Sequence, residues 1–153
     1  MRKVMKLMLA GVLALTMFGC SSTAKTPTID VQETLDTIIT TYFSEMASMP
    51  YDEMYVSEVF GLTEEEIVSF AGVTPMISAV ATDVAVFEAQ EGKVEDVKAA
   101  VESYKEYKKN NAWYPIETEN AEKAVVYVNG NYVFFIMAEN VEEVQAHVEG
   151  LFQ

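Results

Sequence analysis

Few side chains in this sequence combine the residue types and spacing that catalysis needs. Nucleophilic catalysis generally uses a histidine base or an activated thiol, yet the chain has a single histidine, His147, and a single cysteine, Cys20. His147 follows Val144 by three residues, beside an apolar helical stripe, which is typical of a histidine at a solvent boundary. We therefore assign no catalytic residue from the sequence.

The carboxylates also lack the spacing of a metal site. Zinc needs three or four His, Cys or carboxylate ligands at matched spacing. The acidic runs at 64–66 and 139–143 lack the alternating ligands and the glycine of a calcium loop. Both runs stand at predicted helix starts, where carboxylates stabilise the positive end of the helix dipole. The glycines are isolated and form no phosphate-binding loop. We expect no metal ligands and no cofactor.

Paired carboxylates for glycoside hydrolysis are a separate case, because the two residues come together only in the fold. The sequence alone neither supports nor excludes such a pair of carboxylates. A hydrolase that acts on wall glycan or peptide with Asp/Glu chemistry is therefore the alternative function.

Cys20 has a chemistry of its own. Three basic residues precede an apolar run, Leu7–Phe18, which ends in Gly19-Cys20, and this order is typical of an export signal. The run is shorter than the ~20 apolar residues that a membrane-spanning helix needs. The stretch Leu15–Cys20 resembles the bacterial lipobox, which implies cleavage before Cys20 and lipidation of that cysteine. The alternative is an ordinary signal peptide that contains a cysteine.

The lipobox interpretation divides the chain into three parts. We expect a lipoprotein signal peptide at 1–19, a lipidated cysteine and flexible tether at 20–28, and a single globular domain at 29–153. The tether is small, polar and broken by Pro27. Acyl chains such as palmitate on Cys20 would anchor the protein to the cell membrane, facing the extracytoplasmic side.

The composition restricts the partners. The formal net charge is −14, and removal of residues 1–19 takes away basic residues but no acidic ones. Phosphate polymers and anionic headgroups repel such a domain, so we expect no nucleic acid and no direct contact with the membrane surface. We expect a monomeric domain that meets an unknown envelope protein or ligand.

Exposed aromatic residues are the remaining candidates for a contact. Trp113 and Tyr114 lie in a predicted loop before Pro115, and large rings contribute most to interface hot spots. We name Trp113 and Tyr114 as a candidate partner contact. The alternative is that both rings anchor the loop at the edge of the core.

The elements that must position these residues follow from periodicity and punctuation. The strongest local signal is Asn129-Gly130 between two β-branched and aromatic runs, which predicts a tight hairpin. Both faces of its second strand are apolar, so one face should pack under helices at Val97 and Val144, and the first helix or a partner should cover the other. The expected elements are a helix from Asp30 to near Met46, strands at Ile67–Val73 and from about Ala81 to Ala89, a helix at Val94–Lys109, strands at Ala124–Val128 and Asn131–Ala138, and a closing helix from Val141.

This order is a helix followed by strand-strand-helix-strand-strand-helix. Consecutive antiparallel strands with covering helices give an α+β fold. We expect a two-layer sandwich with an antiparallel sheet of about four strands.

Several short motifs occur in order after the lipobox: Phe60-Gly61-Leu62, Pro75-Met76, Asp83–Phe87, Gly92–Val97 and Gly130–Val133. With these motifs the chain resembles the small bacterial lipoproteins that carry domain of unknown function 4358. The resemblance implies the localisation and the extent of the domain, and it brings no activity that could be transferred. From the sequence we expect a membrane-anchored binding or interaction module at the cell envelope.

Overall fold

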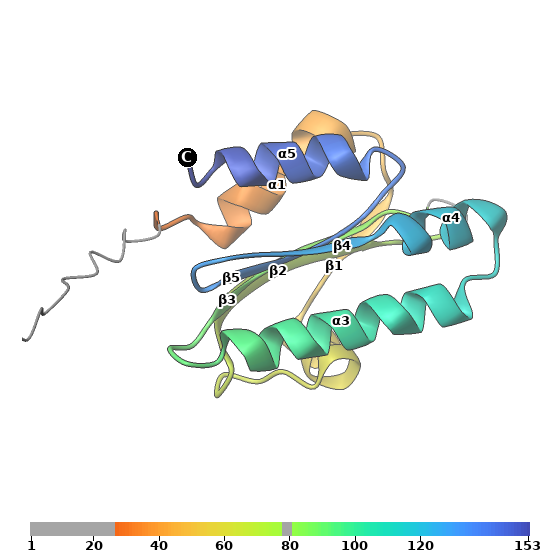
Figure 1. Cartoon of the computed structure of the whole chain (residues 1–153). Helices are drawn as coiled ribbons and strands as arrows, with labels where there is room; N and C mark the ends of the chain where they lie inside the picture. Colours follow the sequence, from red (N-terminus) through yellow and green to blue (C-terminus); the bar gives the residue numbers. More distant parts are fainter. Residues whose placement is uncertain (1–26, 78–80) are drawn as a thin grey trace, which may run out of the picture.

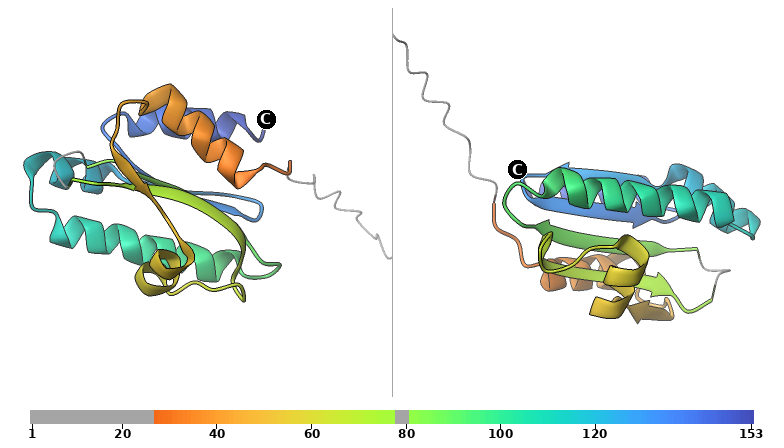
Figure 2. Two further views of the ribbon diagram at one scale, coloured as in Figure 1. Left: turned by 180° about the vertical axis from the view of Figure 1, so that it is seen from behind. Right: turned by 90° about the horizontal axis from the view of Figure 1, so that it is seen from below.

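The computed structural model describes residues 27–77 and 81–153. Five strands form one antiparallel sheet in the order β1-β2-β3-β5-β4, and helices lie on both faces of this sheet (Figure 1, Figure 2). The predicted signal peptide, Cys20 and all of the tether except residues 27 and 28 lie outside the described residues. The elements are α1 (Val31–Tyr42), β1 (Ser48–Pro50), α2 (Glu53–Tyr55), η1 (Val56–Phe60), β2 (Ile67–Pro75), β3 (Asp83–Ala89), α3 (Val94–Asn111), α4 (Pro115–Lys123), β4 (Val125–Asn129), β5 (Tyr132–Met137) and α5 (Val141–Gly150).

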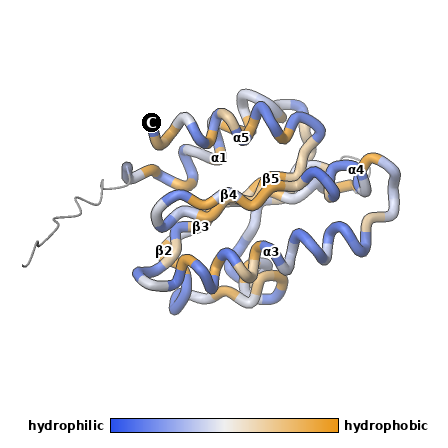
Figure 3. The backbone as a smooth tube through the Cα atoms, viewed as in Figure 1, coloured by the Kyte–Doolittle hydropathy of each residue, from blue (hydrophilic) through white to orange (hydrophobic). Residues whose placement is uncertain are grey.

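The α+β class is confirmed, with five strands where about four were expected. The sheet and the helices on its two faces make three layers, where two were expected. The central strands β3 and β5 are apolar on both faces, so helices must cover each face. Figure 3 shows the hydrophobic residues along these strands. We expected Val97 and Val144 to pack on the same face, and this is wrong. Val97 of α3 lies on one face, whereas Val144 of α5 lies on the other, beside α1.

Two hydrophobic cores result, one on each side of the sheet. The core under α3 and η1 takes the odd-numbered positions of β3 and β5, such as Phe87 and Phe135. The core under α1 and α5 takes the even-numbered positions, such as Val86 and Phe134. Complete burial of an aliphatic or aromatic side chain contributes about 1.5 to 3 kcal/mol, so the two cores hold all three layers together.

The hairpin of β4 and β5 forms where it was predicted, but its turn is shifted by one residue. Asn129 pairs with Tyr132 as the last rung of the ladder, so Gly130 and Asn131 are the two central residues. Gly130 has φ +58°, and Asn131 does not share a positive φ. A positive φ at the first central position only is the pattern of a type II′ turn, in which glycine stands first.

Local signals account for the ends of two other segments. Asp30 caps α1, since its Oδ1 accepts a hydrogen bond from the Glu33 amide (2.9 Å). Before β2, Glu66 Oε2 accepts hydrogen bonds from the Thr63 amide (3.0 Å) and the Thr63 hydroxyl (2.8 Å), and this turn leads into the strand.

Three elements have no counterpart in the sequence expectations: β1, the helical segment of α2 and η1, and α4. The segment of α2 and η1 begins at Asp52, which caps it, and ends at Gly61, whose φ is +68°. Helix α4 begins after Tyr114 with Pro115 in its first turn. The buried Asn120 amide of α4 donates to the Ala81 carbonyl (3.0 Å), which ties α4 to the start of β3.

Candidate functional site

The outer edge of β2 is free along part of its length. β1 pairs only with Val73–Pro75, and no other described strand pairs with β2 on that side. The Gly72 carbonyl accepts a hydrogen bond from the Tyr51 amide on this side (2.8 Å). Backbone groups of an antiparallel strand alternate between its two sides with a period of two. The N–H and C=O of Phe70 therefore point to the free side, where no described group pairs with them.

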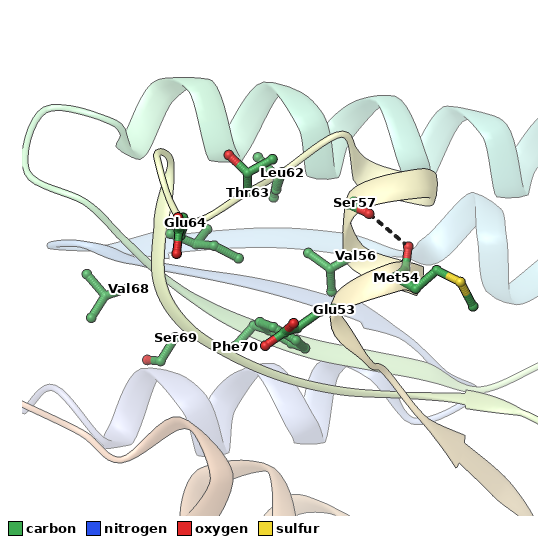
Figure 4. Close-up of a pocket in the computed structure, with 11 residues that line it drawn as sticks. Glu53, Met54, Val56, Ser57, Leu62, Thr63, Glu64, Val68, Ser69 and Phe70 are labelled. Atoms are coloured by element: carbon green, nitrogen blue, oxygen red, sulfur yellow. Dashed lines mark hydrogen bonds between the residues drawn. The ribbon is translucent and has the colours of Figure 1, made fainter.

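A groove of about 760 Å³ runs along this edge on the α3 side of the sheet. Figure 4 shows it between β2, the helical segment of α2 and η1, and the loop that follows η1. Its wall includes the buried side chains of Val56, Leu62 and Ile67. Met54 and Val68 also line it, and 64% and 56% of their surfaces are exposed. The groove therefore has apolar residues in its wall beside polar ones and is open to solvent.

A second groove, of about 470 Å³, lies on the opposite side of the same edge. It is lined by α1, β1 and β2, with Leu35 and Ile39 among its apolar residues. Phe70 borders both grooves. The free backbone of β2 thus lies between two hollows, one on each face of the sheet.

Both hollows carry negative charge. Glu53 and Glu64 line the first groove and Asp36 the second, and among the residues described no lysine or arginine lines either groove. The whole chain has a formal net charge of −14. Clefts lined by one sign of charge raise the local concentration of ligands of the opposite sign. The site therefore favours cationic ligands.

A cluster of polar side chains is buried between the sheet and α3. Asp83, at the start of β3, is fully buried. Its Oδ1 accepts a hydrogen bond from the Tyr51 hydroxyl. Its Oδ2 accepts from the Tyr104 hydroxyl (2.7 Å) and the Thr74 hydroxyl (3.2 Å), and forms an ion pair with Lys108 Nζ (3.1 Å). All of these donors converge on one carboxylate.

Two tyrosines of this cluster, Tyr51 and Tyr104, have raised pKa values. Burial raises the pKa of Tyr51 well above its ordinary value of 10.0, and the negative charge of Asp83 adds to this. The same two causes raise the pKa of Tyr104. Because Tyr104 donates its only proton to Asp83, the Tyr55 hydroxyl donates to Tyr104 (3.0 Å). The cluster is a set of satisfied donors around a paired charge, and Asp83 lines neither groove.

This buried cluster meets the free edge at Tyr51. The ring of Tyr51 lies over Gly72, where a Cβ atom would come within 2.6 Å of Tyr51 Cε2 and 2.9 Å of Ala85 Cβ. Only the absence of a side chain at Gly72 lets the ring lie flat enough on β2 for its hydroxyl to reach Asp83. The polar cluster thus holds the end of the second groove in place.

The candidate contact residues Trp113 and Tyr114 lie on the connection between α3 and α4. Their exposed fractions are 86% and 45%. The Trp113 ring therefore does not anchor the loop in the core, as the alternative required of both rings. Neither residue lines the two grooves. A role of these rings in contacting a partner stays a prediction. His147 is partly buried on α5, with its ring against that of Tyr42.

Sequence reasoning missed the free edge and the Asp83 cluster. One wall of the first groove comes from residues 53–62, a stretch that has neither a helical nor a strand period in the sequence. A signal for the buried cluster was present: Asp83 opens a strand whose next four residues, 84–87, are all apolar. A carboxylate in such a run needs partners.

Within residues 27–77 and 81–153, no three His, Cys, Asp or Glu side chains are grouped so that they could hold a metal ion. None of the helices in those ranges has the length and apolar character to span a membrane.

Comparison with known proteins gives one match. Residues 42–138, more than half of the chain, match the family described as a domain of unknown function, DUF4358. The matched region contains β1 to β5 and the helices between them, and therefore both walls of the first groove. The searches of curated proteins and of solved structures found no match.

Proposed function

Because this chain belongs to the DUF4358 family, whose description assigns no activity, we propose its function from its own residues: it is a membrane-anchored extracytoplasmic lipoprotein that acts as a binding module at the cell envelope. The proposed anchor is lipid on Cys20, supported by the export signal and the lipobox-like stretch before it. The proposed binding surface is the free edge of β2 with its two flanking grooves.

One observation carries the binding role. On its outer side, the backbone of β2 at Phe70 lacks a partner among the described strands, whereas its inner side lies against β3. Exposed edges of this kind are usually covered, shortened or protected by charge when they have no partner. Here the edge is instead flanked on both sides by hollows that have apolar and acidic residues in their walls. An open edge beside shaped hollows is a common arrangement for the recognition of extended segments.

The hydrolase alternative has weaker support. Asp83 is buried, and its two oxygens are occupied by Tyr51, Tyr104, Thr74 and Lys108. Glu53 and Glu64 line a groove, but both are solvent exposed. A general acid in a glycoside hydrolase is generally held in an apolar pocket that favours its protonated form. The observations favour binding over hydrolysis.

Hydrogen exchange in native membranes tests this proposal. We expect the amides of 68–70 to exchange more slowly in isolated native membranes than in the same protein purified in non-ionic detergent, because a bound partner would cover the edge of β2. The amides of α3 near Glu102 serve as the internal control, because they lie away from the β2 edge in the helix Val94–Asn111, and they should exchange equally in both samples. Equal exchange at 68–70 would contradict a binding role for this edge.

A further inference from the structure

We propose that the ligand of this site is an extended, basic peptide segment that adds to the free edge of β2 as a sixth strand. This inference rests on the binding role proposed above and specifies its ligand. The backbone N–H and C=O of Phe70 supply the pairing groups, since they point to the free side of β2. Main-chain hydrogen bonds of this kind give affinity, and the hollows on either side give specificity.

The positions of the two grooves match the geometry of an added strand. Successive side chains of a strand point to opposite faces of the sheet. The groove of about 760 Å³ lies on the α3 face and the groove of about 470 Å³ lies on the α1 face, and Phe70 borders both. A segment paired with β2 would therefore place alternate side chains in the two grooves.

The charge of the site selects a basic segment. Glu53 and Glu64 line the larger groove and Asp36 lines the smaller one, with no described lysine or arginine among the lining residues. Lysine or arginine side chains fit this pattern, because their apolar stems can cover Met54 and Val68 while their charged ends reach the carboxylates. Apolar side chains suit the smaller groove, where Leu35 and Ile39 are available.

The same charges disfavour two other occupants. A second copy of this chain, paired edge to edge, would bring two sets of acidic residues together, and like charges opposite each other destabilise a strand pair. An anionic membrane surface would be repelled for the same reason. Val68, 56% exposed, leaves the edge accessible to a free segment.

The test uses the full-length protein in non-ionic detergent and a short synthetic peptide of alternating lysine and valine with a fluorescent label. We expect binding that weakens as salt is added. The Glu53→Gln, Glu64→Gln double variant should bind about threefold to tenfold more weakly. Glu142→Gln with Glu143→Gln is the matched control, because it removes the same charge from exposed positions on α5 and should bind like the unchanged protein.

The backbone pairing is tested on the peptide, so that the fold of the protein is untouched. Methyl groups are placed on alternate backbone nitrogens in two complementary peptides. We expect one of them to lose more than about tenfold in affinity and the other to bind nearly as well as the parent, because only every second N–H faces β2. The amides of 68–70 should also exchange more slowly when the parent peptide is bound.

Three results would overturn the inference: equal binding of both methylated peptides, equal or tighter binding of a peptide with glutamate in place of lysine, or a dimer of this chain that forms through 68–70. These outcomes are separate from failure of the proposed function. If the amides of 68–70 exchange slowly in native membranes but the lysine peptide does not bind, the binding role of the β2 edge stands. The proposal that its ligand is a basic peptide strand is then wrong. If the edge is unprotected there, the binding role itself is wrong.

Discussion

At the scale of single residues, the fully buried Asp83 is the point where strands β2 and β3, the segment after β1 and helix α3 are tied together. Its charge is matched by Lys108, whose side chain is 14% exposed. Removal of one partner from a buried ion pair generally costs about 3 to 5 kcal/mol, because the other charge is left without compensation. The cluster therefore has a structural role, and its tyrosines make that role measurable.

The tyrosines predict a loss of stability at high pH. In the unfolded chain Tyr51 and Tyr104 ionise near 10.0, whereas in the folded protein their pKa values are raised. The folded state thus retains protons that the unfolded state loses, so stability is complete below pH ~10 and falls as the pH rises above it. Each tyrosine contributes a slope of about 1.4 kcal/mol per pH unit. Urea unfolding over a pH series measures the total slope.

Two variants check the assignment of this slope. Tyr104→Phe should remove about half of the part of the alkaline loss that the two buried tyrosines cause, since of these two only Tyr51 then titrates differently in the folded and unfolded states. Tyr107→Phe is the control, because Tyr107 is 59% exposed and should leave the slope unchanged. An unchanged slope in Tyr104→Phe would mean that Tyr104 is not buried as described.

Gly72 gives a second prediction at this scale. Gly72→Ala should destabilise the fold by about 1 to 3 kcal/mol, because the new Cβ would displace the Tyr51 ring from β2. Gly150→Ala is the control: nothing lies within 4 Å of a Cβ at that position, and alanine favours a helix. Chemical denaturation measures both. A neutral Gly72→Ala would show that Tyr51 does not lie over this position.

At the scale of elements, the hairpin of β4 and β5 offers a test of its turn. Gly130→Val should cost about 1 to 3 kcal/mol, because a β-branched residue is forced to positive φ. Asn129→Val should cost less, since Asn129 is the last residue of β4 and has extended backbone. The melting temperatures of the two variants show which two residues form the centre of the turn between β4 and β5. A larger loss in Asn129→Val would put the turn at Asn129-Gly130 after all.

The elements with strong periodicity could be predicted from the sequence, and those without it could not. Helices α3 and α5 repeat apolar residues at helical spacing, and β3 and β5 are long apolar runs. By contrast, α4 has few apolar residues and β1 is three residues long, so neither has a pattern that could be recognised. The face on which each helix packs depends on long-range contacts, which explains why α3 and α5 were placed together.

The same limit applies to the candidate site. The free edge exists because β1 pairs with only the last three residues of β2, and no local motif specifies where a partner strand stops. The flanking grooves join segments that are far apart in sequence, such as α1 and β2. Trp113 was recognised as a candidate contact because its type and its loop position are both local properties.

At the scale of the whole molecule, the described chain begins at one end of the sheet, and α4 lies at the opposite end (Figure 1, Figure 2). Trp113 and Tyr114 precede α4 and are therefore far from the point where the tether would join the domain. The free edge of β2 lies along the side of the molecule between these ends. An anchored domain could thus present the β2 edge to a partner that lies beside it in the envelope.

The anchor gives a prediction that does not depend on the binding site. A fatty-acid analogue supplied to growing cells should label the unchanged protein and should not label Cys20→Ala. The Cys20→Ala protein should keep the same melting temperature, because the sequence places Cys20 before a small, polar tether and outside the domain expected at 29–153. Recovery of unlabelled, unchanged protein in the soluble fraction would contradict lipidation.

The central claim is that the edge of β2 is the binding surface, and photo-cross-linking in whole cells tests it most directly. A photoreactive amino acid is placed at Val68 on the edge, at Trp113 near α4, or at Glu102 on the exposed face of α3, each in the full-length protein. We predict a discrete cross-linked product from Val68, suppressed by Glu53→Gln with Glu64→Gln, and none from Glu102. A product from Trp113 alone, or equal products from all three positions, would contradict the claim.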